Sequence, residues 1–356
     1  DTAPNDIAHQ KGGGAGGRAS VYIGNEAGEN VDNSDGGAAN NTFIGNTAGK
    51  NVTSGERNTF LGSGAGEFVT TGRYNVLVGH GTKGNTDIDS NVIIGYSTGT
   101  YVGANNQAAD ENVILGSGAV SVHGGNVDNN ILIGYRASRY LGDAQGTSNV
   151  HIGYGAAQNV VTASNNIAIG FECMTSAGGG TSGGTHVTNN VAIGRRPLAA
   201  LSNGALANVA IGTEAGNSNT SGSYNILMGY RVAYNNSGDL GTNNILMGTS
   251  VGNNIDGGEY NVLIGRQAAV RLTTASDNIF IGQNAGYDKT TGDHFIAIGK
   301  NAGRGSGITL GTNASSIFIG SEARSATEGA TNETVIGTNA IGKGSNTVVL
   351  GDDNVT

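Results

Sequence analysis

The chain has 356 residues and an unusual composition for a globular domain: 64 residues are Gly, only 2 are Pro and none is Trp. No Gly-X-Y triplet runs through it, which excludes collagen, and charged residues make up only 13%, too few for a disordered, solvating chain. The formal net charge of −9 argues against nucleic acid or an anionic membrane as the main partner, because both attract basic surfaces.

In chain order, residues 1–19 are predicted to form a Gly-rich lead-in and residues 20–356 a single repeat domain. A five-residue block recurs through the repeat domain, in most copies as Asn, three apolar residues and Gly. Its 19 copies end at Gly24, Gly45, Gly62, Gly79, Gly95, Gly116, Gly134, Gly153, Gly170, Gly194, Gly212, Gly229, Gly248, Gly265, Gly282, Gly299, Gly320, Gly337 and Gly351. The commonest spacing is 17 residues, and the longer intervals predict loop insertions near 29–40, 100–111, 173–189 and 304–315.

Each repeat is predicted to contain a short strand, a corner, a second weaker strand and a turn. A small residue and often a second Gly follow the block, as in Ala48-Gly49 and Ala65-Gly66, and Gly supplies the positive φ that tight corners need. The apolar runs of three do not have the spacing of a helix. Stacking such coils predicts an all-β, parallel β-solenoid of about 19 short coils, in which backbone groups bond to the next coil.

Within the block, the first and third apolar positions share one face of the strand, and the middle position lies on the other. We expect the first and third positions to fill the coil interior. The middle position, which includes Phe43, Phe60 and Leu132, is then expected to form an outward apolar stripe. A monomer would expose more apolar surface than soluble proteins tolerate. We therefore predict a parallel homotrimer that closes three stripes around one axis; the alternative, a covering layer of the same chain, finds no spare segment long enough.

The N-x-x-I-G-x-x-A-G repeats, and above all the closing stretch E-T-V-I-G-T-N-A-I-G-K-G-S-N-T-V-V-L-G-D-D-N-V-T from Glu333 to Thr356, resemble two known groups of repeats. These are the head domains of trimeric autotransporter adhesins and the repeat shafts of phage tail-fibre proteins. The resemblance implies a homotrimeric, left-handed β-roll, and a C-terminal stretch like those that precede a self-cleaving intramolecular chaperone. Head-domain coils have 14 residues, so the longer repeats of this chain imply an extra outer loop.

Few residues have the pattern of a catalytic or metal site. His151 is a polar residue in the stripe assigned to the trimer axis, where three copies could bind a metal or an anion, or where the ring could hydrogen-bond a neighbour. Acidic pairs such as Asp87 and Asp89 are scattered over loops, and we expect none to recur on adjacent coils. We therefore predict no catalytic residue, no cofactor and no enzyme activity. Cys173, at a small position, is expected to be a buried thiol.

Tyr96, Tyr135, Tyr154 and Tyr230 directly follow a block Gly. Their rings could stack on sugars, but the regular placement favours packing between coils.

Together these observations predict an extracellular trimeric fibre or adhesin, in which a rigid shaft presents loops to a cell-surface glycan or protein receptor. A phage tail fibre and a bacterial surface adhesin both agree with these observations, so the expected location is a cell-surface appendage or a virion. The expected partner is the chain itself, as a homotrimer, without nucleic acid and without membrane insertion. A purely structural filament subunit is the alternative. A polysaccharide depolymerase is less favoured, because no acidic pair is expected to recur on adjacent coils. An ice-binding solenoid is also less favoured, because the Thr residues do not align in every coil.

Overall fold

The computed structural model of the chain is a parallel β-solenoid, which confirms the all-β, parallel solenoid part of the predicted fold class. It describes residues 7–11, 19–32, 37–84, 87–99, 109–120, 127–139, 146–160, 162–175, 186–201, 204–235, 239–304, 315–327 and 329–352. Every regular element among them is a β-strand, and no helix occurs in this part of the chain. The chain forms two compact units, Asp1–Val187 and Thr188–Thr356. The predicted domain limits, 1–19 and 20–356, stay a prediction.

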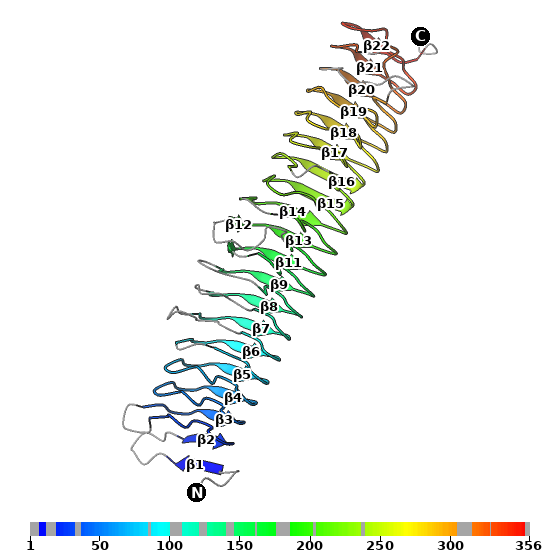
Figure 1. The fold of residues 1–356 in the computed structure, drawn as a ribbon. Helices are drawn as coiled ribbons and strands as arrows, with labels where there is room; N and C mark the ends of the chain where they lie inside the picture. The colour runs from blue at the N-terminus through cyan, green and yellow to red at the C-terminus, as the bar shows by residue number, and fades with distance from the viewer. Residues whose placement is uncertain are drawn as a thin grey trace. The chain divides into compact units, whose positions relative to one another are not determined.

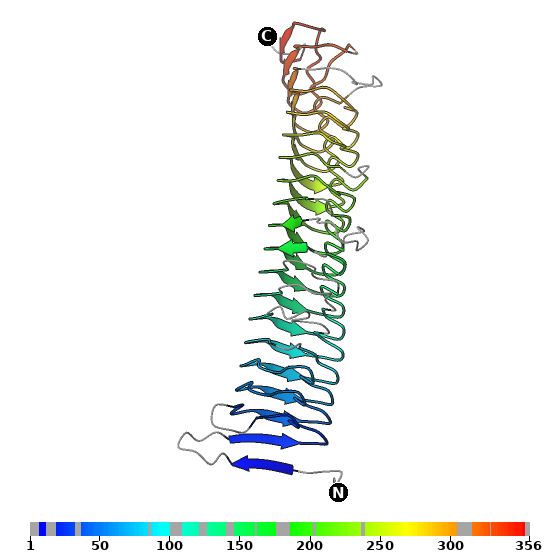
Figure 2. The ribbon, with the colours of Figure 1, turned by 60° about the vertical axis from the view of Figure 1, so that its left-hand side comes forward.

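The first unit contains a ladder of parallel strands, each paired with the corresponding strand of the next coil (Figure 1). These strands are β2 (Ala19–Ile23), β3 (Thr42–Ile44), β4 (Thr59–Leu61), β5 (Val76–Val78), β6 (Val92–Ile94), β7 (Val113–Leu115), β8 (Ile131–Ile133), β9 (Val150–Ile152) and β11 (Ile167–Ile169). Before them, β1 (Ile7–Lys11) pairs with β2 in the antiparallel sense, and Figure 2 shows the two dark-blue arrows pointing in opposite directions.

The second unit repeats the arrangement with its own parallel ladder. Its strands are β13 (Val191–Ile193), β14 (Val209–Ile211), β15 (Ile226–Tyr230), β16 (Ile245–Thr249), β17 (Val262–Ile264), β18 (Ile279–Ile281), β19 (Ile296–Ile298), β20 (Ile317–Ile319), β21 (Thr334–Ile336) and β22 (Val348–Leu350). The short strands β10 (Thr162–Ser164) and β12 (His186–Thr188) form a separate two-stranded sheet. All 19 predicted strand blocks are therefore strands.

The strands face the opposite way from the prediction. The middle residue of each block points into the coil, so that Phe43, Phe60 and Leu132 are fully buried. The first and third residues point outward, and in β4 both Thr59 and Leu61 are exposed. The alternation was predicted correctly, but the assignment of the inner side was wrong. Three apolar residues in a row give no inside–outside contrast, so the neighbouring residues decide the orientation.

The block Asn decides it, because its side chain is buried and lies on the same side of the strand as the middle residue. Asn58 is typical: its backbone N–H donates to Oδ1 of Asn41 at 2.9 Å, and its Nδ2 donates to the carbonyl of Gly72 at 2.8 Å. Oδ1 of Asn58 in turn accepts the N–H of Asn75 at 3.0 Å. The column comprises Asn41, Asn58, Asn75, Asn91, Asn112, Asn130, Asn149 and Asn166 in the first unit, and Asn190, Asn208, Asn225, Asn244, Asn261 and Asn278 in the second. We call it the asparagine ladder.

The block Gly is required by both its conformation and its surroundings. Gly62 has a φ of 130°, and a Cβ added to it would lie 2.3 Å from the carbonyl oxygen of Gly79 in the next coil. No other residue tolerates this combination of positive φ and close backbone approach. The strand therefore ends just before the block Gly in every coil except those of β15 and β16, which continue one residue past it.

Turns take the place of the predicted second strand in most of the described coils. After the block, Thr47 adopts a φ of 53°, and its N–H donates to the carbonyl of Asn25 in the preceding coil at 2.8 Å. Arg57 adopts a φ of 58° and bonds in the same way to the carbonyl of Ala39. These left-handed residues keep the chain tightly curved while its N–H groups still bond between coils. An extended second strand would satisfy the same N–H groups without the curvature.

In the coil interior, the middle residue of the block shares one space with the fourth residue after the block Gly. Phe43 is followed by Gly49, and a Cβ on this glycine would lie 2.6 Å from the Phe43 ring. In two coils with a small middle residue, Ala192 and Ala168, the later position is filled by the buried Leu198 and Met174. After Ala297 the later position is Gly303, and the ring of Phe295 approaches this space instead. The large side chains that fill the interior thus come from different positions in different coils, and each interior is close-packed.

Candidate interaction surface

The most prominent functional candidate is the outward face, which we define as the first and third residues of each block. Every member is half-buried or exposed. In the first column the residues are Val, Ile or Thr, and the third column comprises Ile23, Ile44, Leu61, Val78, Ile94, Leu115, Ile133, Ile152, Ile169, Ile193, Ile211, Met228, Met247, Ile264, Ile281, Ile298, Ile319, Ile336 and Leu350. Strands that meet water on one face normally place polar residues there. The apolar outward face is therefore the main candidate for an interaction surface.

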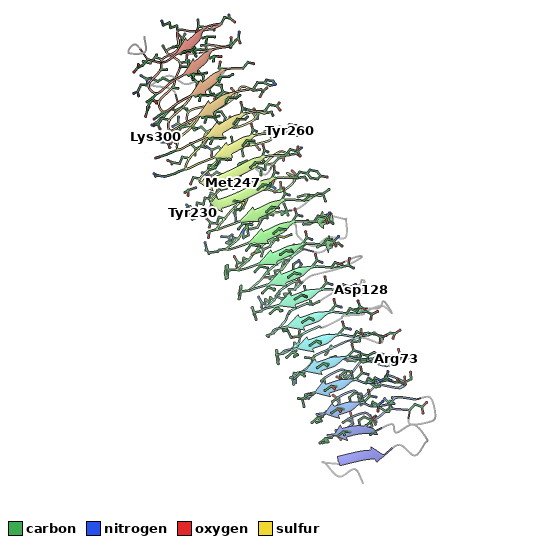
Figure 3. The ribbon with its side chains drawn as sticks, turned by 180° about the vertical axis from the view of Figure 1, so that it is seen from behind. Arg73, Asp128, Tyr230, Met247, Tyr260 and Lys300 are labelled. Carbon is green, nitrogen blue, oxygen red and sulfur yellow. The ribbon has the colours of Figure 1, made fainter. Side chains whose placement is uncertain are left out.

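Two edges border the outward face. We call the two residues before the asparagine-ladder position of a coil its start edge, and the two residues after the block Gly its end edge. In the second unit, Figure 3 shows Tyr230 and Lys300 at one end of the strands and Tyr260 at the other. In the first unit, Arg73 and Asp128 lie at the start edge (Figure 3). Side chains at the edges are thus placed on opposite sides of the apolar columns.

Aromatic residues of the end edge stack on one another from coil to coil. The rings of Tyr135 and Tyr154 have centroids 5.3 Å apart with an interplanar angle of 26°, and those of Tyr154 and Phe171 are 5.2 Å apart at 9°. Tyr96 stacks in the same way on His80, with centroids 5.5 Å apart. The expectation of packing between coils is confirmed for these rings. Stacked neighbours cover the ring faces that a sugar would need, which disfavours sugar stacking along the column.

The remaining end-edge tyrosine, Tyr230, has a cation against its face. The guanidinium carbon of Arg231 lies 5.2 Å from the Tyr230 ring centroid and 4.9 Å from that of Tyr234. Arg231 also donates from Nε to Oε2 of the shielded Glu214 carboxylate at 2.8 Å. This ion pair lowers the pKa of Glu214. The Tyr230 ring is therefore a packing element of the surface too.

Three carboxylates on adjacent coils form a column at the start edge, which the expectation that no acidic pair recurs on adjacent coils did not anticipate. The backbone N–H of Asp89 donates to Oδ1 of Asp110 at 2.7 Å, and the N–H of Asp110 donates to Oδ1 of Asp128 at 3.0 Å. Burial, together with the charges of Asp89 and Asp128, raises the pKa of Asp110. Each of the three residues lies six positions before its block Gly, so the sequence itself carried the alignment that the prediction overlooked. The carboxylates cap backbone groups, and the described residues contain no cluster of His, Cys, Asp and Glu that could hold a metal.

His151 lies inside the coil, not on an outward stripe, so the candidate site at a trimer axis is wrong for this residue. Its Nδ1 is 2.5 Å from Oγ of Ser138, and its Nε2 is buried without a hydrogen-bond partner among the described residues. Burial lowers the pKa of His151 to about 3, so the ring is neutral at ordinary pH. Cys173 is buried, as expected. Both residues are part of the packed interior.

The predicted loop insertions near 29–40, 100–111, 173–189 and 304–315 fall largely outside the described residues, which exclude 33–36, 100–108, 176–185 and 305–314. Their role in recognition stays a prediction.

Sequence reasoning missed the asparagine ladder and therefore the true outward face. The signal was present, because Asn occupies the same place in 14 of the 19 blocks. Asn at a site that needs only a turn is exchangeable with Gly, Asp or Ser. Such a uniform choice indicates that the amide itself is used, as donor and acceptor together.

Within the described part of the chain, no helix has the length and hydropathy needed to span a bilayer. No protein-family model matches the sequence, and no curated protein is significantly similar to it.

Proposed function

We propose that the chain is the shaft of an extracellular homotrimeric fibre, which attaches a phage or a bacterial cell to a surface ligand, in the manner of the adhesin and tail-fibre repeats that it resembles. The observation that carries the proposal is the apolar outward face. Three copies that turn this face toward a common axis remove it from water and leave the turns and loops outside. The same resemblance supports a left-handed coil.

The size of the face supports an interface between copies. At about 4.8 Å per strand and a width of about 10 Å, the nine parallel strands of the first unit present on the order of 400 Å² of nearly flat apolar surface. The second unit presents a face of the same kind. Patches of this size on soluble proteins are usually interaction sites. A second copy is the occupant that matches the face along its whole length, because the partner has the same coil repeat.

A closed ring of three is favoured over an open array. Closed cyclic symmetry buries the face completely and leaves no copy with an exposed column. The outward residues of β17, such as Val262 and Ile264, are β-branched, and such side chains pack well against a similar flat surface because they have few rotamers to lose. The face therefore suits a dry, regular interface.

Attachment is assigned to the outer turns and loops, because loops on a rigid scaffold carry recognition in repetitive proteins. A purely structural filament would instead stack its ladders end to end. In the first unit β1 pairs antiparallel with β2, so the N-terminal edge of this parallel ladder is already covered. This pairing disfavours growth of a filament through that edge.

Binding of the fluorescently labelled chain to a glycan panel, and to bacterial cells with and without capsule, tests the proposed attachment. We expect saturable binding to a defined surface glycan or receptor. A variant with Ile264→Lys and Ile281→Lys on the outward face is expected to bind at least tenfold more weakly, because single chains lose avidity. The matched control is Thr274→Lys on an exposed turn. Absence of binding to every glycan and cell type would contradict an adhesive role and favour a structural one.

A further inference from the structure

Two tyrosines of the second unit differ from all the others that the structure describes. Every other tyrosine in the described residues has a neighbouring ring or a cation on its face. Tyr224 and Tyr260 have neither within this part of the chain, and each is 55% exposed. Aromatic faces bind other rings, apolar C–H groups and cations, and these two faces are still available to a ligand.

The two tyrosines belong to one column of the start edge, with Asn243 between them. Each of the three residues adopts a left-handed conformation, with φ of 59° at Tyr224, 60° at Asn243 and 57° at Tyr260. The backbone N–H of each donates to a start-edge carbonyl of an earlier coil, at 2.9, 3.2 and 3.1 Å in the same order. The same local fold therefore places the three side chains on successive coils in register. Figure 3 shows Tyr260 at the start-edge end of its strand.

The spacing of the column leaves room for one more ring. Tyr224 and Tyr260 are two coils apart, about 9.6 Å at about 4.8 Å per coil. Where aromatic residues occupy adjacent coils of this chain, their ring centroids are 4.8 to 5.5 Å apart. A ring placed midway would thus lie at stacking distance from both tyrosines.

Asn243 occupies the level between the rings with a short side chain. Its Nδ2 donates to Oγ1 of the adjacent Thr242 at 3.2 Å, so the amide stays close to the backbone. The same column of the first unit shows what a long side chain does at this level: the guanidinium carbon of Arg57 lies 5.1 Å from the ring centroid of Tyr74 in the next coil. An amide is too short to cover two tyrosine rings in this way.

We propose that Tyr224 and Tyr260 bind one neutral pyranose ring of a glycan between them, above Asn243. The inference rests on the proposed attachment to a surface ligand, and it names a site and a chemical class for that ligand. The C–H faces of a pyranose are apolar and pack on aromatic rings, whereas its hydroxyls project from the rim and need polar partners. The amide of Asn243 and the hydroxyl of Thr242 are such partners.

The charges around the site favour a neutral sugar over an acidic one. Glu259 directly precedes Tyr260, and Asp277 follows it in the next coil of the same column, with its side chain 51% exposed. Carboxylates accept hydrogen bonds from sugar hydroxyls, and they repel the carboxylate of a uronic or sialic acid. A guanidinium or quaternary ammonium group also stacks on tyrosine, but the two residues at the level between the rings are uncharged, which suits a sugar better.

Calorimetric titration of the full chain tests the site, with the methyl glycosides of glucose, galactose, mannose and N-acetylglucosamine as probes. We expect at least one of them to bind with a Kd of about 10 mM or tighter, and the methyl glycoside of glucuronic acid to bind about tenfold more weakly or less. Tyr224→Ala and Tyr260→Ala should each weaken binding about tenfold, without a change in native mass. Tyr74→Ala is the matched control, because it removes an exposed ring of the same column whose face is covered, and it should leave binding unchanged.

Four results would overturn the proposal. These are no binding of any of the four neutral glycosides, an equal loss with Tyr74→Ala, tighter binding of choline than of every glycoside, and a lower native mass of the Tyr224→Ala or Tyr260→Ala chain. The last result would assign the rings to a contact between copies.

A substitution at Asn243 provides a second readout. Asn243→Tyr fills the level between the rings with a ring of the chain itself, in a conformation that tyrosine already adopts at both neighbours. We expect this variant to melt at a higher temperature through two new stacking contacts and to lose glycoside binding. Asn243→Ala leaves the space open and should bind more tightly than Asn243→Tyr. Wild-type binding by Asn243→Tyr would contradict the site.

The site and the proposed function fail separately. If the Tyr224→Ala, Tyr260→Ala double variant attaches to glycans or cells as the wild-type chain does, the site is wrong and the adhesive function stands. If the wild-type chain binds the glycosides but attaches to no surface glycan and no cell, the site stands and the adhesive function is wrong.

Discussion

At the level of single residues, the buried amides take the structural role that a second strand has in other solenoids. Most ladder Asn residues form three hydrogen bonds: the N–H and Nδ2 both bond to the previous coil, and Nδ2 also bonds to a carbonyl across the coil. For Asn261 these bonds run to Oδ1 of Asn244, at 3.0 Å from each nitrogen, and to the carbonyl of Ala275 at 2.9 Å. A run of buried polar groups is favourable only when every member is satisfied.

Replacing one ladder residue is therefore expected to be costly. Asn261→Ala leaves the carbonyl of Ala275 and the N–H of Asn278 without these partners, and we expect a loss of about 2–4 kcal/mol in the free energy of unfolding. Denaturant titration followed by circular dichroism measures it. Asn254→Ala, at an exposed turn position, is the control and should change stability by less than about 0.5 kcal/mol. Similar losses for the two variants would argue against the ladder.

The block Gly gives a prediction with an internal control. A Cβ at Gly282 would lie 2.4 Å from the carbonyl oxygen of Gly299, whereas a Cβ at Gly257 would meet no atom within 4 Å, although its φ is also positive at 76°. We expect Gly282→Ala to destabilise by about 2–4 kcal/mol, through backbone displacement as well as strain. For Gly257→Ala we expect about 1 kcal/mol from strain alone. Thermal melting compares them, and equal effects would mean that the close approach is unimportant.

The buried His151 makes stability depend on pH. Its pKa is lowered from 6.5 to about 3 by burial, so the unfolded chain binds a proton that the folded chain does not. Stability from this residue is fully present above pH 6.5 and is lost as the pH falls toward 3, by about 1.4 kcal/mol per pH unit within that window. His151→Leu should remove this part of the slope. Unfolding free energies at about pH 4 and about pH 7 for both proteins test it, and parallel pH profiles would refute it.

At the level of the coil, side chains from several positions fill the interior together, so no single position shows how the interior is packed. Phe280 lies over Gly286, where a Cβ would approach the ring to 2.2 Å. In the coil around Ala192 the same space is filled by Leu198 instead, and Leu198 adopts a φ of 48°. The two arrangements are alternative solutions for one interior.

This equivalence predicts a compensating pair of substitutions. Phe280→Ala should cost about 3–5 kcal/mol through the cavity that it leaves, and Gly286→Leu should also destabilise, because the new side chain overlaps the ring. The double variant is expected to be more stable than either single variant, as the two changes convert the coil to the Ala192–Leu198 type. A double-mutant cycle measures the coupling. Additive losses would show that the two positions do not share one space.

The sequence was sufficient to predict where the strands lie, but not which of their residues face the coil interior. The position of the block Gly predicted where all the block strands lie and where all of them but β15 and β16 end, because close backbone approach leaves glycine as the only choice. The block itself misled, because Phe43 and Leu61 are both large and apolar, and only the hydrogen bonds of Asn58 show which of them is inside. The alignment of Asp89, Asp110 and Asp128 was missed although each lies six residues before its block Gly, so the block positions already gave their common register. The insertions that vary the interval lie elsewhere in the coil and leave this register intact.

At the level of the whole molecule, the corrected orientation changes which residues the proposed assembly would cover, and the apolar face that motivates the proposal remains. The residues that now face outward are apolar in nearly every coil, and those at Val348 and Leu350 are 70% and 67% exposed. A soluble protein with such a face associates through it or binds another apolar surface. The proposed homotrimer is the arrangement that uses the same face on every copy.

The native mass tests the central claim most directly. Light scattering after size-exclusion chromatography on the 35.6 kDa chain is expected to give a mass close to three chains, and a mass close to one chain for the Ile264→Lys, Ile281→Lys variant with an unchanged circular dichroism spectrum. The Thr274→Lys control should keep the wild-type mass. A wild-type chain that elutes as a stable monomer, with the outward face in water, would contradict the account.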